Sequence, residues 1–177
     1  TFCRSCGIAT IRSSARNHEH HTASSKPGTY AFLDIQQPIV KAGLTPNSTF
    51  AFFLFAVDAF SRYTRIYGIP TKTSKAVIHA IKQYVADCQR PDSFEYVNLD
   101  RIRADAGSQF TSTEFAQYCV DHAINLSLAA PKKQNQNHLA ERSWQTICGM
   151  ARSLLVHARL PDTFWFHALK YASDIFN

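Results

Sequence analysis

The sequence has no long uninterrupted apolar run, no internal repeat and no low-complexity tract. The apolar run around 50–57 is much shorter than the roughly 20 residues that a membrane-spanning helix requires. We therefore expect no spanning helix and no membrane partner. There is neither an initiator Met nor a basic leader followed by an apolar segment, so we expect a piece of a longer polypeptide without a secretory signal.

A disulfide framework is also unexpected, because the five cysteines are odd in number and mostly dispersed. This usage favours a reducing compartment. Only Cys3 and Cys6 lie close together, and their Cys-x-x-Cys spacing is that of two zinc ligands. Three alternatives stay open for this pair. Histidines among His18, His20 and His21 complete a zinc site, histidines upstream of this sequence complete it, or the cysteines are ordinary surface residues.

The residues that are present suffice for one folded domain. Of the 177 residues 45% are hydrophobic, with 13 Phe and 7 Tyr, which is ample for a packed core and excludes wholesale disorder. The formal net charge of +6 favours a polyanionic partner. Residues 1–28 are polar, basic and rich in Ser and His, which is typical of a linker. We therefore expect a linker followed by a folded core over 29–177.

The hydrophobic periodicity predicts an α/β domain with a five-stranded mixed sheet flanked by helices. The predicted strands cover 29–40, 49–60, 62–70, 96–105 and 126–130. The predicted helices cover 72–89, a segment that begins at 111, 138–160 and 163–176. Thr111 is the expected N-cap of the second helix, because Glu114 would complete a capping box. Phe110 is expected to pack on Phe115 there, and Phe164 is expected among the apolar residues of the last helix.

Two acidic residues lie in or at the end of apolar strands. Asp34 is in the middle of the first strand, whose apolar residues on both faces predict burial on both sides. A lone carboxylate there would be costly, so a cation or a tight hydrogen-bond network should compensate it. Asp58 ends the second strand, where we expect it to accept hydrogen bonds from the turn or to pair with Arg62.

Two further acids form the most suggestive pair. Asp105 ends a strand shortly before Gly107, which permits a tight turn, and Glu141 lies near the start of the long helix. A strand end and a helix start can bring two carboxylates to one point. Two clustered carboxylates call for a cation.

The long helix carries a broad apolar stripe when it is turned at about 100° per residue. The members of the stripe are Trp144, Ile147, Cys148, Ala151, Leu154, Leu155 and Ala158. Glu141 lies at its edge, and Gln145, Arg152 and Arg159 align close to that edge. A surface that faces both a metal and phosphates would require this arrangement. The alternative is an ordinary amphipathic helix with a solvated polar face.

Five motifs together resemble copia-type retrotransposon integrases and, more broadly, the retroviral integrase and DDE transposase superfamily. They are LDIQQP (33–38), VDAFSRY (57–63), RADAGSQF (103–110), PKKQNQNHLAER (131–142) and LPDTFW (160–165). The match runs through nearly all of the chain in order, and the spacing between Asp105 and Glu141 is the one for which the family is known. The resemblance implies a ribonuclease H-like fold with Asp34, Asp105 and Glu141 as a catalytic triad. It also implies two Mg²⁺ or Mn²⁺ ions and DNA strand transfer, with or without prior trimming of the 3′ ends.

The resemblance also implies a context for the rest of the chain. Residues 1–28 would be the tail of an N-terminal zinc-binding module plus a basic linker, with Cys3 and Cys6 as half of a His-His-Cys-Cys site for Zn²⁺. The partners would be DNA, as element ends and as target, and further copies of the chain. The protein would be made as part of a cytoplasmic polyprotein and act on chromosomal DNA in the nucleus.

The expected DNA contacts rest on charge and helix geometry, and for Asn137 on an Asn that the family shares. They are Lys132, Lys133, Asn137, Gln145 and Arg152. The chain departs from the family at His138, where a Gly is usual, at Gln134, where a Pro is usual, and at Ala59, where a second acid is common. Two other functions stay open. One is a catalytically degenerate or domesticated fragment that only binds DNA, and the other is a nuclease for RNA–DNA hybrids.

Overall fold

The computed structural model of the protein describes residues 24, 26–37, 50–89, 98–129 and 138–177. Its strands are β1 (Tyr30–Gln36), β2 (Phe52–Asp58), β3 (Thr64–Ile69), β4 (Arg101–Ala104) and β5 (Asn125–Leu128). Its helices are α2 (Ser74–Cys88), α3 (Ser108–Thr111), α4 (Thr113–Asp121), α5 (His138–Ala158), the 3₁₀ turn η2 (Asp162–Phe164) and α6 (Trp165–Phe176). No helix within these ranges combines the length and the apolar character that crossing a bilayer requires.

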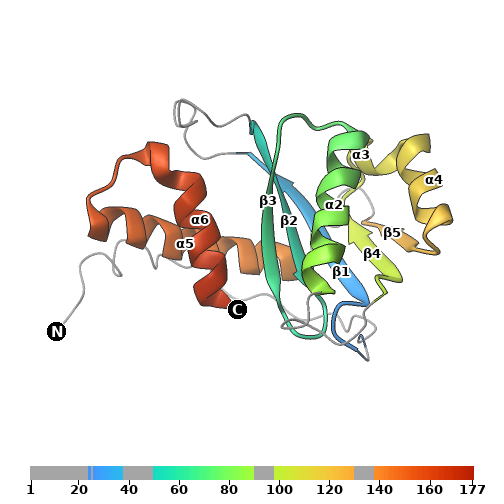
Figure 1. The fold of residues 1–177 in the computed structure, drawn as a ribbon, viewed down its shortest axis with the longest axis horizontal. Helices are drawn as coiled ribbons and strands as arrows, with labels where there is room; N and C mark the ends of the chain where they lie inside the picture. The colour runs from blue at the N-terminus through green and yellow to red at the C-terminus, as the bar shows by residue number, and fades with distance from the viewer. Residues whose placement is uncertain (1–23, 25, 38–49, 90–97, 130–137) are drawn as a thin grey trace.

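The strands form one mixed sheet in the order β3-β2-β1-β4-β5 (Figure 1). Strands β1, β2 and β3 pair antiparallel, whereas β4 runs parallel to β1 and β5 runs parallel to β4. Helices cover both faces of this sheet. The predicted ribonuclease H-like fold, with five strands in a mixed sheet, is confirmed.

Strand β1 is the centre of both hydrophobic cores, because successive side chains of a strand point to opposite faces. Ala31 and Leu33 enter the core that is shared with α2 and α4. Tyr30 and Phe32 enter the core that is shared with α5 and α6. All four side chains are buried, so the prediction that this strand is covered on both faces is confirmed.

Helix α5 packs on β1 and β2 through most of the predicted stripe. The stripe members that are buried are Trp144, Ile147, Cys148, Ala151 and Leu155. The Trp144 ring meets Phe55 of β2 edge to face, with the ring centroids 5.4 Å apart. Contacts of this kind fix the helix on the sheet and thereby fix the position of its first turn, which carries Glu141.

The end of α5 differs from the prediction. Arg159 adopts a left-handed backbone conformation with a φ of 53°. The amides of Arg159 and Leu160 donate to the carbonyls of Val156 and Leu155, which ends the helix at Ala158. Ala158 is exposed in this last turn. Arg159 thus lies just past the end of the helix, which was predicted to run to 160.

The start of the second helical region also differs from the prediction. The short helix α3 precedes α4, and the N-cap of α4 is Ser112, whose hydroxyl accepts a hydrogen bond from the Phe115 amide at 3.1 Å. Thr111 does not serve as this cap, because it is already part of α3. The predicted capping box with Glu114 is therefore wrong. The rings of Phe110 and Phe115 do pack, edge to face at 5.4 Å.

Two smaller predictions are also corrected. Phe164 ends the 3₁₀ turn that precedes α6 rather than belonging to the last helix, and it is 40% exposed. Within the predicted strand 96–105 only β4 pairs in the sheet, and 96–97 lie outside the described residues.

Hydrogen bonds of Asp58 connect the segment just before β1 to the turn between β2 and β3. Its carboxylate is fully buried and accepts hydrogen bonds from the Gly28 amide at 2.7 Å and from the Ser61 amide and hydroxyl at 2.6 and 2.7 Å. The expected role as an acceptor in the turn is confirmed. Because Gly28 lies just before β1, this contact fixes where the central strand starts.

Candidate active site

Asp34 and Asp105 lie on neighbouring strands. In the parallel ladder of β1 and β4 the last register pair is Phe32 with Arg103. Two residues further along each chain stand Asp34 and Asp105, so they occupy the same level of the sheet. Neighbouring strands are about 4.8 Å apart, which brings the two backbones close.

The two acids also belong to the same face of the sheet, because residues paired across a parallel ladder point the same way. The pair of Tyr30 and Arg101 illustrates this, with the Arg101 guanidinium 5.0 Å from the centre of the Tyr30 ring. Tyr30 and Phe32 face α5 and α6. Alternation therefore puts Asp34 and Asp105 on the face that α5 covers.

Glu141 reaches this face from the first turn of α5. Ala140 and Trp144 beside it are buried in the core with β1 and β2, whereas Glu141 itself is exposed. The helix thus holds the carboxylate at the border between the core and solvent. Its negative charge raises the pKa of Asp34 on β1.

The pKa of Asp34 depends on its burial and on the neighbouring acids. Burial is the main cause that raises its pKa, and the negative charges of Asp105 and Glu141 raise it further. A hydrogen bond from the Gln36 side-chain amide to Oδ2, at 2.5 Å, opposes this increase. This hydrogen bond therefore supplies part of the compensation that was expected for the half-buried Asp34 carboxylate. Gln36 was not predicted as a site residue, although its i+2 position on the strand places it on the same face.

The loop after β4 is built closely around Gly107. The Gly107 amide donates to Asp105 Oδ1 at 3.2 Å. A Cβ atom at this position would lie 2.2 Å from Nε2 of Gln109 and 3.0 Å from Asp105 Oδ1. A larger residue here would have to displace the end of the Gln109 side chain, whereas the backbone itself, with a φ of −63°, does not call for glycine. Gln109, which the sequence did not single out, is buried, and its carbonyl accepts from the Ser74 hydroxyl of α2 at 3.0 Å.

The carboxylates of Asp34, Asp105 and Glu141 do not form a closed metal-binding cluster. Within the described residues no set of three His, Cys, Asp or Glu side chains is close enough to enclose a metal ion. Asp34 and Asp105 are neighbours, and Glu141 approaches them to a distance at which its charge matters. Repulsion between like charges favours this separation. The donor set consists of carboxylate oxygens, which suits hard ions such as Mg²⁺ and Mn²⁺. The assignment of the three residues as a triad stays a prediction.

The predicted DNA contacts are described only in part. Gln145 and Arg152 are exposed on α5, four and eleven residues after Glu141, on the same side of the helix. The other predicted residues lie outside the described part of the chain, and these are Cys3, Cys6, Lys132, Lys133 and Asn137. Their roles stay predictions.

A neutral residue at position 34 should stabilise the protein when no metal is present. The pKa of folded Asp34 lies above its ordinary value of 3.8, so the ionised form opposes folding. This cost is absent below pH 3.8 and develops as the pH rises through the raised pKa. We expect Asp34→Asn to add about 1 kcal/mol to the free energy of unfolding at pH 7, or about 3 °C in Tm. The gain should shrink towards pH 4.

Thermal melts in buffer with a chelator measure this effect. The matched control is Asp100→Asn, which removes the same charge from an exposed position before β4, at the opposite end of that strand from Asp105. The control should change Tm by less than about 1 °C. A lower Tm for Asp34→Asn at pH 7 would contradict the assigned repulsion.

The sequence matches the family model described as "Integrase core domain" over residues 25–134. The chain is 32% identical over 146 residues to the retrovirus-related Pol polyprotein from transposon TNT 1-94 of Nicotiana tabacum, a match that covers 82% of this chain. It is 26% identical over 155 residues to the corresponding polyprotein from transposon RE2 of Arabidopsis thaliana, covering 87% of this chain. In both cases the match spans 10% of the relative's length.

Solved structures share the fold at low sequence identity. The simian T-cell lymphotropic virus intasome, in complex with the PP2A regulatory subunit B56 gamma, matches with a TM-score of 0.70 at 20% identity over 97% of this chain and 55% of that chain. The HTLV-2 integrase catalytic core domain in complex with magnesium, in a trimeric form, matches with a TM-score of 0.61 at 20% identity over 84% of both chains.

Proposed function

Since the chain belongs to the integrase core domain family and is related to retrotransposon Pol polyproteins, we propose that it catalyses DNA strand transfer as the core of a copia-type integrase. The reaction joins a 3′-hydroxyl of element DNA to a phosphate of a target duplex. Trimming of the element's 3′ ends precedes it if the same carboxylates also act on a water molecule.

One observation carries this proposal. Asp34 and Asp105 stand at one level on adjacent parallel strands, and the charge of Glu141 from α5 is felt at Asp34. Three carboxylates from three separate elements are thus directed to one edge of the sheet. Clustered carboxylates that raise one another's pKa are typical of functional sites, and a bound cation would relieve their repulsion.

Each residue then has a defined task. Asp34, Asp105 and Glu141 would hold two Mg²⁺ or Mn²⁺ ions, which activate the attacking hydroxyl and stabilise the leaving oxygen when bound. The Gly107 amide and the Gln36 amide orient the carboxylates of Asp105 and Asp34.

The exposed side of α5 would receive DNA next to these carboxylates. Gln145 can donate to phosphate without a charge, and Arg152 can donate two parallel hydrogen bonds to one phosphate. Lys132, Lys133 and Asn137, which precede α5 in the chain, would extend this contact.

The wider context is also part of the proposal. Residues 1–28 are the tail of a zinc-binding module with a basic linker, in which Cys3 and Cys6 bind Zn²⁺, and 29–177 are the catalytic core. The chain works as a homo-oligomer on DNA, in line with the intasome and with the dimeric and trimeric core domains among the structures that share its fold. It acts in the nucleus after synthesis within a cytoplasmic polyprotein, in line with its Pol polyprotein relatives.

Strand transfer with short duplexes tests the proposal. Element-end duplexes and a labelled target duplex are incubated with the protein in Mg²⁺ or in chelator. We expect joined products only with the metal. Cleavage of an RNA–DNA hybrid in preference to joining would favour a hybrid nuclease, and DNA binding without any joining would favour the degenerate or domesticated fragment.

Metal binding should be measurable without activity. A ligand that binds only the folded state at 100 times its Kd stabilises it by about 2.7 kcal/mol, or roughly 8 °C in a domain of this size. We expect saturating Mn²⁺ to raise the Tm of the wild type by this order and to raise that of Glu141→Gln much less. Equal shifts for both proteins would exclude Glu141 as a ligand.

A further inference from the structure

A row of basic side chains runs along the exposed face of α2 and the residues just before it, away from the proposed triad. It consists of Lys72, Lys75, His79 and Lys82, and we name it the α2 stripe. Lys72 lies just before the N-cap Thr73, and the spacings of four and three residues put Lys75, His79 and Lys82 on one side of the helix. The opposite side of α2 is buried against the sheet. From Lys75 to Lys82 the helical part of the stripe extends for about 10 Å at 1.5 Å per residue.

Across the described residues, no lysine of the stripe has a carboxylate within salt-bridge distance. Two of the lysines are instead held over aromatic rings. Lys72 Nζ lies 5.0 Å from the centre of the Phe52 ring, and Lys82 Nζ lies 5.7 Å from that of Tyr118. These contacts reduce the freedom of the cations and leave their charge available to a ligand.

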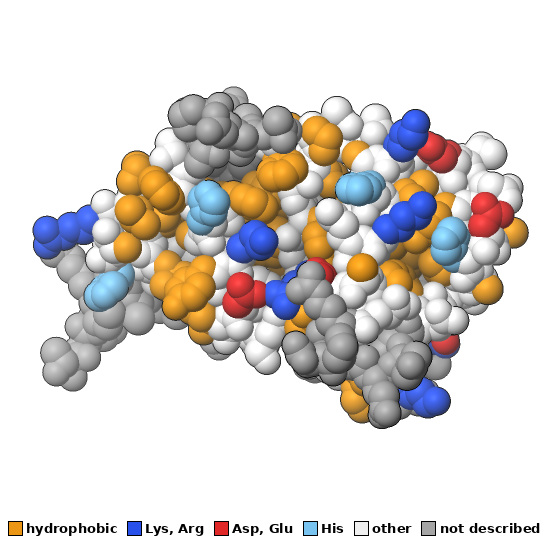
Figure 2. All heavy atoms as spheres, in the orientation of Figure 1, with side chains coloured by type: hydrophobic (Ala, Val, Ile, Leu, Met, Phe, Trp, Pro, Cys, Tyr) orange, Lys and Arg blue, Asp and Glu red, His pale blue; other side chains and the backbone are white. Residues whose placement is uncertain are grey.

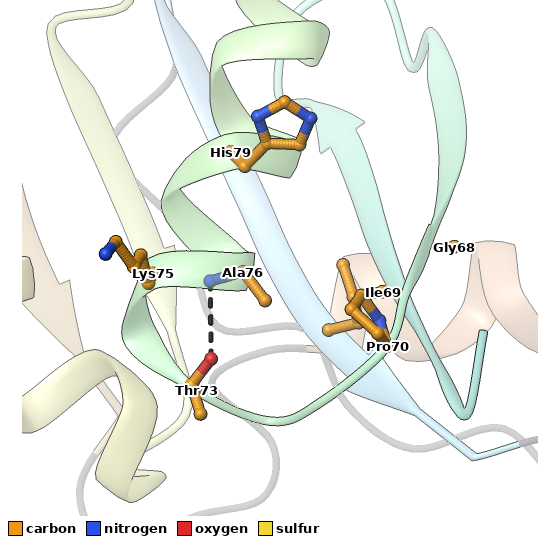
Figure 3. A pocket seen from close by; sticks show the side chains of 7 residues that line it. All are labelled: Gly68, Ile69, Pro70, Thr73, Lys75, Ala76 and His79. Carbon is orange, nitrogen blue, oxygen red and sulfur yellow. Dashed lines mark hydrogen bonds between the residues drawn. The ribbon is translucent and has the colours of Figure 1, made fainter. Parts of the chain in front are cut away.

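The surface beside the stripe is open. A hollow of about 480 Å³ lies between the end of β3 and the start of α2, and Lys75 and His79 contribute to its wall. Figure 3 shows these two side chains projecting from successive turns of α2, with Lys75 on the side of the helix away from Pro70. In Figure 2 basic side chains gather over α2, with acidic ones further towards α4. Glu114 and Asp121 of α4 are exposed, so acidic side chains are present on the neighbouring helix.

The stripe is connected to the loop that carries Asp105. The Ser74 hydroxyl, between Lys72 and Lys75 in the chain, donates to the Gln109 carbonyl at 3.0 Å and shares a hydrogen bond with the Ser112 hydroxyl at 2.6 Å. Gln109 in turn packs against Gly107. The first turn of α2 is therefore anchored beside the proposed active site, and the stripe leads away from it on the other face of the sheet.

We infer that the α2 stripe binds the phosphate backbone of duplex DNA that extends beyond the reacting phosphate. Lysines act as point charges and do not provide the bidentate geometry that reads bases, so the contact is independent of sequence. The helical part of the stripe, about 10 Å long, together with Lys72 before it can face more than one phosphate of a strand. The inference rests on the proposed function in one respect, namely that DNA is the substrate.

The salt dependence of DNA binding tests this inference directly. Each phosphate neutralised contributes about 0.9 to the slope of log K against log salt concentration. We expect the triple variant Lys72→Gln, Lys75→Gln and Lys82→Gln to lower the magnitude of this slope by roughly 2 to 3 on a random-sequence duplex. The measurement is made on the whole chain without divalent metal, so it does not depend on catalysis.

A second triple variant controls for net charge. Lys26→Gln, Arg62→Gln and Lys170→Gln change three exposed cations elsewhere on the surface and alter the net charge equally. We expect this control to keep the wild-type slope. Circular dichroism and thermal melts of both variants establish that each is folded.

The outcomes separate the inference from the proposed function. Equal slopes for the wild type and both triple variants, or equal losses in the two variants, would overturn the α2 stripe as a DNA contact. Tighter stripe-dependent binding of polyglutamate than of duplex DNA at the same salt concentration would also overturn it, in favour of an acidic protein partner. A stripe-dependent slope in a protein that never joins DNA would support the inference and overturn the proposed strand transfer.

Discussion

Asp105→Asn is expected to reduce the rate of strand transfer by at least about 10³-fold while the protein stays folded. The amide has the shape of the carboxylate, and its oxygen can still accept the Gly107 hydrogen bond. It lacks the negative charge that holds a divalent cation, and loss of roughly 4 kcal/mol of electrostatic stabilisation corresponds to this factor. The rate of joining is measured with duplex oligonucleotides at saturating Mg²⁺.

The control for this experiment is again Asp100→Asn, because Asp100 and Asp105 flank opposite ends of β4. The control should keep the wild-type rate within about twofold. Asp34→Asn and Glu141→Gln should resemble Asp105→Asn, since residues that act as one unit show similar single losses. Equal amounts of product from Asp105→Asn and the wild type would remove Asp105 from the proposed triad.

Asp58→Ala is expected to lower the free energy of unfolding by about 3 to 5 kcal/mol, or roughly 10 °C in Tm. Asp58 is fully buried, and its side chain accepts from the Gly28 amide and from both the amide and the hydroxyl of Ser61. Alanine would leave these donors without their acceptor in a place where water has little access. Because Gly28 precedes β1, the loss would also loosen the start of the central strand.

Chemical denaturation with urea measures this effect, with Asp100→Ala as the exposed control. The control should change the free energy of unfolding by no more than about 0.5 kcal/mol. Asp58→Asn, which keeps one acceptor oxygen, should fall between the two alanine variants. A loss below about 1 kcal/mol for Asp58→Ala would mean that the three donors find other acceptors.

The departures from the sequence-based expectations have local causes. Thr111 was predicted as an N-cap because Glu114 follows it by three residues. In the structure Thr111 is the last residue of α3, and Ser112 is the N-cap of α4. Arg159 looked like a helical residue until the left-handed cap at the end of α5 excluded it. Both depend on a single turn of backbone, where propensity differs little between neighbouring residues.

The role of Gly107 shows a second kind of difference. A glycine after a strand predicts a turn, but the feature seen here is the close approach of the Gln109 and Asp105 side chains. Gln36 lies within a motif but was not predicted as a site residue, and its importance comes from the 2.5 Å contact with Asp34. Such contacts depend on rotamers and on neighbours, which periodicity does not encode.

The sequence by itself determined the α/β class and the burial of β1 on both faces, which follow from patterns of two and 3.6 residues. The choice of Asp34, Asp105 and Glu141 as the acids to test came from the resemblance to integrases, which also implied the ribonuclease H-like fold. Only the tertiary structure decided that Asp34 and Asp105 share one level and one face, because this depends on the register between β1 and β4. It also decided that Glu141 approaches them without closing around an ion, since the distance is set by how α5 packs on the sheet.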